Sequence, residues 1–194
     1  PIVADLSSTI LSRKIDVSRY GLIYAGAQKN IGPAGVVVVI IRKDLLARSQ
    51  DSLPTTWNFA KIAENGSMVN TPPTYSIYLA NLVFEWLLEQ GGVEAMEAIN
   101  IEKARRLYQK LDSSALFANN IDANYRSRMN IPFTLADESL EKTFLAESEV
   151  AGLKTLAGHR SVGGMRASIY NAMPMDGIVS LIDFMNAFEK KHGY

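Results

Sequence analysis

A single lysine placed between two apolar runs constrains the fold of this chain more than any other feature. Residues 22–25 form the first run, and residues 36–41 form the second, an unbroken series of valine and isoleucine. Such a series is typical of a β-strand that is buried on both faces. Lys29 lies between the runs in a glycine-rich segment, flanked by Gln28 and Asn30. We therefore expect Lys29 in a loop that connects two neighbouring strands.

Two interpretations of Lys29 are open at this point. A charged ammonium group is costly to remove from water unless it is paired, so burial favours the neutral amine. A neutral lysine amine is a nucleophile toward carbonyl groups. The alternative is an exposed lysine in a loop, which is the usual situation of lysine. Only residues elsewhere in the chain distinguish these interpretations.

Composition argues against several classes of function. Of the 194 residues, 47% are hydrophobic, and 20 basic residues balance 20 acidic ones. The balance gives no reason to expect nucleic acid or an anionic membrane as a partner. Cysteine is absent and there are two histidines, so we expect no disulfide and no metal site. No apolar run is long enough to span a membrane, and we expect a cytoplasmic protein. Because Pro1 begins an apolar strand, we expect a fragment of a longer chain.

The pattern along the chain predicts two domains, an α/β domain at residues 1–91 and an α+β domain at residues 92–194. Strands that include residues 2–4, 22–25 and 36–41 should form a mixed sheet in the first domain. Residues 74–89 should form a helix that is apolar nearly all round, and such a helix is buried in a core or at a subunit interface. Gly91 and Gly92 should end it. Thr71, just before two prolines, could cap its first turn.

The second domain should be a compact α+β unit. We expect helices at 93–111 and 137–151 and a last helix that starts at Pro174 and stops at Gly193, with strands at 129–133 and 165–169. In the first helix, Ile99 is assigned to the apolar face and Lys103 to the polar face.

Asp5, Asn70 and Thr71 are candidates for binding a cofactor. Asp5 follows the first strand, which we expect to be buried, and ligands in α/β sheets bind at the carboxyl ends of strands. Its carboxylate could face a cationic ring nitrogen, although a turn or cap is the alternative. Asn70 and Thr71 could donate hydrogen bonds to a phosphate at a helix start, with simple capping as the alternative.

His159, Arg160 and Arg166 are candidates for binding a substrate. An arginine on a half-buried strand needs an anionic partner, and its guanidinium can hold a carboxylate through two hydrogen bonds. A structural ion pair is the alternative for Arg166. His159 and Arg160 lie near two glycines, which permit close approach of a ligand. A lysine amine, a carboxylate, phosphate donors and an arginine are together the components of a pyridoxal-phosphate site.

Five segments, taken in order, resemble the phosphoserine aminotransferase family in its bacterial form, within the class V aminotransferases. They are residues 5–8, 24–35, 65–74, 127–133 and 158–172. The resemblance covers essentially the whole chain. It implies an α/β fold of the fold-type I pyridoxal 5'-phosphate-dependent transferases, with residues 1–91 as the C-terminal part of the large cofactor domain and residues 92–194 as the small domain. It also implies that the missing part is N-terminal, and we expect little activity from the isolated chain.

The resemblance also implies the cofactor site. Lys29 matches the lysine that binds the cofactor covalently and moves the proton. Asp5 matches the carboxylate at the ring nitrogen, and Gln28 matches a contact of the cofactor phosphate. Asn70 and Thr71 match phosphate contacts that are supplied across the interface of a homodimer.

The substrates are implied in the same way. Arg166 matches the arginine that holds the substrate carboxylate, and His159 and Arg160 match residues near the substrate phosphate. The implied reaction transfers an amino group from glutamate to 3-phosphohydroxypyruvate in serine biosynthesis, giving O-phosphoserine and 2-oxoglutarate. A related amino transfer serves pyridoxine biosynthesis.

Two alternatives remain open. Another fold-type I aminotransferase or lyase, acting on an unphosphorylated amino acid, would use the same lysine. The segment containing His159 and Arg160 would distinguish it, because that enzyme would show no preference for a phosphorylated substrate. The second alternative is a non-catalytic dimerisation fragment.

Overall fold

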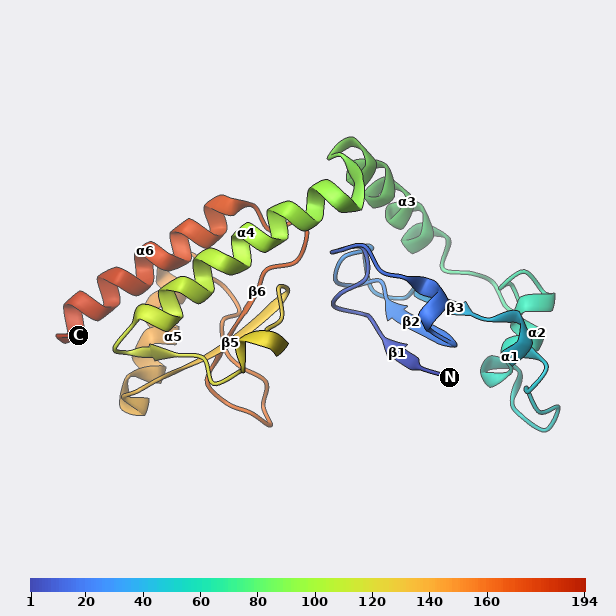
Figure 1. The fold of residues 1–194 in the computed structure, drawn as a ribbon, viewed down its shortest axis with the longest axis horizontal. Coiled ribbons are helices and arrows are strands. Elements are labelled where there is room, and N and C mark those ends of the chain that lie inside the picture. Colours follow the sequence, from blue (N-terminus) through green and yellow to red (C-terminus); the bar gives the residue numbers. More distant parts are fainter. The chain divides into compact units, whose positions relative to one another are not determined.

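The computed structural model describes all residues from 1 to 194, and the chain divides into two compact units (Figure 1). The first unit is Pro1–Glu94 and the second is Ala95–Tyr194. The boundary falls inside helix α4 (Gly92–Ser113), three residues beyond the predicted position. The assignment of the two parts to a large and a small domain stays a prediction.

A mixed three-stranded sheet organises the first unit. Its strands are β1 (Val3–Asp5), β2 (Leu22–Gly26) and β3 (Val37–Ile41), in that order across the sheet. β1 runs parallel to β2, with Asp5 opposite Tyr24, and β3 runs antiparallel to β2. A small cluster of buried apolar residues lies under the loop that follows β2: Ile10, Ala25, Ala27, Ile31 and Ala80.

The expected burial of β1 and β3 is wrong for this chain. Val3 is 61% exposed and Val37 is 63% exposed. Both strands lie at the edges of a three-stranded sheet, and of the apolar run at 36–41 only Val36 and Val38 pack against the buried cluster. An apolar strand is buried only where other elements cover its faces, and within this chain much of the surface of β1 and β3 has no such cover.

Helix α3 (Thr74–Glu89) has the predicted bounds but is not buried within the chain. Its buried residues are Ala80 and Leu87. Its large exposed side chains are Tyr75, Ile77, Tyr78, Leu82, Phe84 and Leu88. The alternative, a subunit interface, stays a prediction. Helix α2 (Phe59–Glu64) was not predicted, because the surrounding sequence has no helical period. The unit also contains α1 (Lys43–Leu46) and the 3-10 turns η1 (Val17–Arg19) and η2 (Thr55–Trp57).

The second unit is the expected α+β structure. An antiparallel sheet has the order β4 (Phe117–Ala118), β5 (Asn130–Leu135), β6 (Met165–Ser168). The short strand β4 was not predicted. The helices are α4, α5 (Glu141–Val150) and α6 (Met175–His192), with 3-10 turns η3 (Ala123–Tyr125) and η4 (Glu138–Leu140). Helices α4 and α6 lie side by side, and an ion pair between Lys110 and Glu189 joins them (Figure 1). Gly193 ends α6 in a left-handed conformation, φ 82°, as expected.

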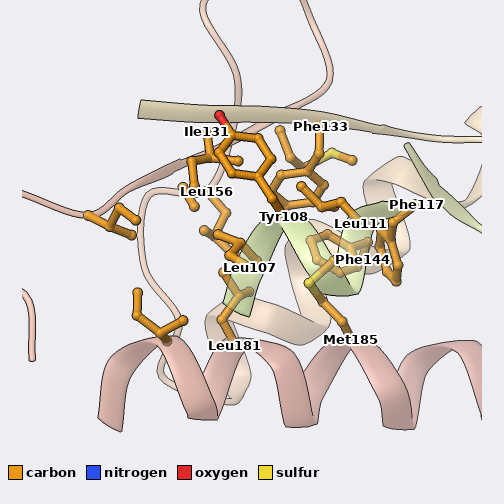
Figure 2. Close-up of a cluster of buried hydrophobic side chains, with 14 of the residues drawn as sticks. Leu107, Tyr108, Leu111, Phe117, Ile131, Phe133, Phe144, Leu156, Leu181 and Met185 are labelled. Atoms are coloured by element: carbon orange, nitrogen blue, oxygen red, sulfur yellow. The ribbon is translucent and has the colours of Figure 1, made fainter. Parts of the chain in front are cut away.

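The core of this unit lies between the helices and β5 (Figure 2). Leu107 and Leu111 of α4 and Met185 of α6 meet Phe133 of β5 there. Phe144 makes edge-on ring contacts with Phe133 at 5.9 Å and with its neighbour Phe117 at 5.3 Å between centroids. Such aromatic clusters contribute more than their buried area alone.

Two predictions for α4 are wrong. Lys103, assigned to the polar face, is fully buried, and Ile99, assigned to the apolar face, is 42% exposed. Met96, Asn100, Lys103 and Leu107 recur at three and four residues and form one buried stripe. Residue type rather than spacing led to the misassignment.

None of the helices has the combination of length and hydropathy that crossing a bilayer requires.

Candidate active site

Asp5 and Lys29 are brought together at one edge of the first sheet. β1 and β2 are parallel, so their carboxyl ends lie at the same edge. Asp5 is the last residue of β1, and Lys29 lies three residues beyond the end of β2. The two charges are close enough that Lys29 contributes to lowering the pKa of Asp5. The sheet therefore places a carboxylate beside a half-buried lysine.

Hydrogen bonds from Ser7 are the main reason for the lowered pKa of Asp5. The backbone N–H of Ser7 donates to Asp5 Oδ1 at 2.9 Å and its hydroxyl donates to the same atom at 2.6 Å. The predicted turn at Asp5 is therefore present, and it keeps the carboxylate ionised. Ser7 was not predicted as a site residue, although an aspartate followed by a serine two positions later is a recognisable turn sequence.

The backbone around Lys29 is held firmly. The carbonyl of Ala27 accepts hydrogen bonds from the N–H groups of Ile31 at 3.1 Å and Gly32 at 2.8 Å. The buried amide of Asn30 donates to the carbonyl of Ile10 at 3.0 Å. Lys29 therefore projects from a loop whose position is set by buried neighbours, as a reactive group requires.

Gly32 explains the close packing of this loop on α3. A Cβ atom at Gly32 would lie 3.3 Å from the backbone Cα of Ala80. Ser76, one turn earlier in α3, donates to the carbonyl of Ala34 at 3.2 Å.

The side chain of Gln28 is exposed and folds back over Gly26. A Cβ atom added at Gly26 would lie 2.4 Å from the side-chain oxygen of Gln28.

Asn70 and Thr71 are exposed and do not cap α3, so the prediction of a capping role is wrong. The N-cap of α3 is Pro73, without a side-chain capping bond. The two prolines move the start of the helix beyond the reach of Thr71. Asn70 donates only a long bond of 3.3 Å to the adjacent carbonyl of Thr71. The polar groups of both side chains therefore remain open to solvent and could bind a ligand.

In the second unit, Arg166 is half-buried on β6 and makes no ion pair. Its neighbours Met165 and Ala167 point into the core, so Arg166 lies on the opposite face of the sheet. Its Nε is buried and has no hydrogen-bond partner. A buried donor without a partner is uncommon. The structural ion pair is therefore excluded within this chain, and an anionic ligand would satisfy the guanidinium.

His159 and Arg160 are exposed on a tight loop. The N–H of Gly158 donates to the carbonyl of Gly164 at 2.8 Å, and a Cβ at Gly158 would lie 2.0 Å from the carbonyl oxygen of Gly163. Only glycine therefore permits this closure. His159 Nδ1 lies 2.7 Å from the hydroxyl oxygen of Ser161, and the N–H of Ser161 points to the same nitrogen at 3.3 Å, so Ser161 orients the ring.

The sheet and the lysine loop place the chain in the α/β class of fold-type I pyridoxal-phosphate-dependent transferases, as the likeness to solved enzymes of this class shows. The sequence profile described as aminotransferase class-V matches residues 1–181. The chain therefore belongs to the class V aminotransferase family, and the fold class expected from the sequence is confirmed.

The relatives are phosphoserine aminotransferases. The enzyme of Marinomonas sp. (strain MWYL1) is 74% identical over 193 residues, which are 100% of this chain and 54% of that protein. The solved structure from Bacillus circulans subsp. alkalophilus is 47% identical with a TM-score of 0.96, covering 99% of this chain and 54% of that chain. The structure from Trichomonas vaginalis, described as bound to pyridoxal phosphate, is 44% identical with a TM-score of 0.91, covering 96% and 53%. The chain thus spans about half the length of the relatives that it matches.

Proposed function

We propose that this chain is the C-terminal part of a phosphoserine aminotransferase. The enzyme would transfer the amino group of glutamate to 3-phosphohydroxypyruvate, giving O-phosphoserine and 2-oxoglutarate in serine biosynthesis, with a related step in pyridoxine biosynthesis. The observation that supports this most is the placement of Asp5 beside Lys29 at the carboxyl ends of two parallel strands. The 74% identity to the Marinomonas enzyme supports the choice of substrates.

The residues at this edge of the sheet fit pyridoxal 5'-phosphate. The Ser7 hydrogen bonds keep the pKa of Asp5 low, so its carboxylate is anionic at neutral pH and suits a protonated ring nitrogen. Both Ser7 bonds go to Oδ1, and the side chain of Tyr24 makes a smaller contribution to the lowered pKa. Lys29 offers an amine to the aldehyde carbon. Gln28 offers an exposed amide to the phosphate, and Asn70 and Thr71 offer their exposed amide and hydroxyl groups to the phosphate in the site of the partner subunit.

Each residue has one task in this proposal. When bound, the cofactor supplies an electron sink that stabilises negative charge at the substrate α-carbon. The Lys29 amine would take the proton from that carbon and pass it to C4′ of the cofactor, and would carry a proton in the opposite direction when the amino group goes to the second substrate. Asp5 keeps the proton on the ring nitrogen. Arg166 holds the substrate carboxylate through two hydrogen bonds and so orients the substrate. His159 and Arg160 bind the substrate phosphate.

The proposed enzyme is a cytoplasmic homodimer in which Asn70 and Thr71 serve the site of the partner subunit. The exposed apolar side chains of α3, which starts three residues after Thr71, support this arrangement. A large apolar surface on a monomer indicates an interaction site.

The test uses the full-length enzyme, meaning this chain joined to the part of the Marinomonas relative that it does not span. On addition of pyridoxal phosphate, the wild type should develop the visible absorption band of a lysine-bound cofactor. Lys29→Ala should abolish that band, and Lys43→Ala, at an exposed lysine in α1, should not. The same band in wild type and Lys29→Ala would show that Lys29 is not the lysine that binds the cofactor. Equal kcat/KM for 3-phosphohydroxypyruvate and its unphosphorylated analogue would instead favour a different aminotransferase.

A further inference from the structure

Lys103 is a fully buried lysine that faces backbone carbonyl groups instead of a carboxylate. It lies on α4 with 0% of its surface exposed. Its Nζ donates to the carbonyl oxygens of Ile169 at 3.3 Å, Tyr170 at 2.9 Å and Met173 at 3.0 Å. None of the ion pairs of the structure includes it.

A buried ammonium group without a carboxylate partner destabilises the fold, so a side chain that only filled this space would be expected to be apolar. Removing an ammonium group from water is unfavourable, and an apolar side chain of similar volume is often tolerated at such a position. Desolvation lowers the pKa of Lys103 to about 8. The ammonium is compensated by three carbonyl groups that belong to one short segment, residues 169–173. The buried lysine therefore determines the position of that segment.

The segment is the continuation of β6, the strand that contains Arg166. Ile169 comes directly after the last residue of β6. Its N–H donates to the carbonyl of Met129 at 2.8 Å, next to the start of β5. The amide of Asn100, one turn before Lys103 on α4, donates to Asn171 Oδ1 at 2.9 Å. Helix α4 therefore holds the carboxyl end of β6 at two places, through Lys103 and through Asn100.

A third contact fixes the face of the sheet on which Arg166 lies. The hydroxyl of Tyr170 donates to Asn130 Oδ1 at 2.9 Å, and Asn130 lies opposite Ser168 in the β5–β6 pair. Ser168 is two residues from Arg166 on the same face. A displacement of the segment held by Lys103 would therefore be passed along β6 and would move the guanidinium, whose Nε has no partner within the chain.

We propose that Lys103 is a positioning residue for Arg166: by holding the carbonyls of Ile169, Tyr170 and Met173, it sets the guanidinium where it meets the substrate carboxylate. Lys103 contacts neither substrate nor cofactor. The proposal rests on the proposed carboxylate-binding role of Arg166.

The test is a double-mutant cycle in the full-length enzyme, with KM for glutamate and kcat as readouts. Lys103→Met should raise KM about tenfold or more, because small displacements of an orienting group have large effects, and should change kcat less than threefold. In an Arg166→Lys background, Lys103→Met should raise KM less than twofold further, since the group that it positions is already impaired. An unchanged KM, or equal effects in both backgrounds, would overturn the proposal.

Lys110→Met is the matched control, because Lys110 lies on the same helix but forms its ion pair with Glu189 of α6 instead of bonding to the carbonyls of residues 169–173. It should leave KM unchanged, and a rise equal to that of Lys103→Met would also overturn the proposal. If Lys103→Met does not fold, Lys103→Gln takes its place, and a wild-type KM in that variant would count against the proposal. An Arg166→Lys variant with unchanged KM would refute the carboxylate role of Arg166 itself, whatever the result at Lys103.

Discussion

The hydroxyl of Ser7 donates a hydrogen bond of 2.6 Å to Oδ1 of Asp5, while the same oxygen of Ser7 accepts one of 3.0 Å from the backbone N–H of Gly26. A single hydroxyl therefore connects the carboxylate at the end of β1 with the last residue of β2, just before the loop of Lys29. The electrostatic state of Asp5 and the start of the lysine loop depend on the same side chain.

Ser7→Ala should raise the pKa of Asp5, because it removes the largest cause of the lowered value while the backbone bond remains. In the full-length enzyme, the acidic limb of the kcat/KM profile should move to higher pH, with a several-fold loss of activity on that limb. Ser18→Ala provides the control: Ser18 makes the same two bonds to Asp16, at 3.1 and 2.5 Å, away from the proposed site residues. An equal shift in both variants would contradict the role of Ser7.

Asp5→Ala should lower kcat more than it weakens binding of pyridoxal phosphate, because the carboxylate acts on the charge of the ring. We expect a loss in kcat on the order of 100-fold, typical of losing a preorganised electrostatic group, and a change in the cofactor Kd below about tenfold. Steady-state kinetics and a cofactor titration on the same preparation measure both. A loss of affinity for pyridoxal phosphate as large as the loss in kcat would mean that Asp5 serves mainly to hold the cofactor.

Arg166→Lys should raise KM for glutamate about 10- to 100-fold, because one ammonium group cannot reproduce the two parallel hydrogen bonds of a guanidinium. Arg160→Lys, on the exposed loop, serves as the comparison variant. In it, KM for the phosphorylated substrate should change more than KM for glutamate. An unchanged glutamate KM in Arg166→Lys would refute carboxylate binding by this residue.

The stability of the second unit should rise with pH above 8. The pKa of Lys103 is about 8 in the folded chain, against the ordinary value of 10.5, because burial disfavours the charged form. Between these values the unfolded chain binds more protons, so raising the pH stabilises the folded state, by roughly 3 kcal/mol over the whole interval. Burial raises the pKa of Tyr108 to about 12, which has the opposite effect above pH 10.

The free energy of unfolding, measured by urea denaturation followed by circular dichroism, should therefore reach a maximum near pH 10. In Lys103→Met the rise between pH 8 and 10 should disappear while the fall above pH 10 remains. A wild-type stability that falls steadily from pH 8 would contradict the burial of a neutralisable lysine.

Local patterns predicted most elements of the fold. The bounds of α3, Gly193 at the end of α6 and the strand–loop–strand arrangement around Lys29 all follow from rules that act over a few residues. The missed elements were β4, which is only two residues long, and α2, which lacks a periodic apolar face. The candidate site residues were singled out by residue type and position, and their roles were assigned from the resemblance to the aminotransferase family, so they stay predictions.

The sequence by itself determined the residues available for chemistry, their order and the strands and helices that bear them. Only the tertiary structure decided which of them meet. It placed Asp5 beside Lys29 through a parallel strand pair, left Arg166 without an ion pair, and buried Lys103 against three carbonyl groups. It also left the apolar strand β3 exposed. Burial and pairing depend on what other segments cover a residue, and contacts between segments distant in the chain are not encoded in any short stretch of it.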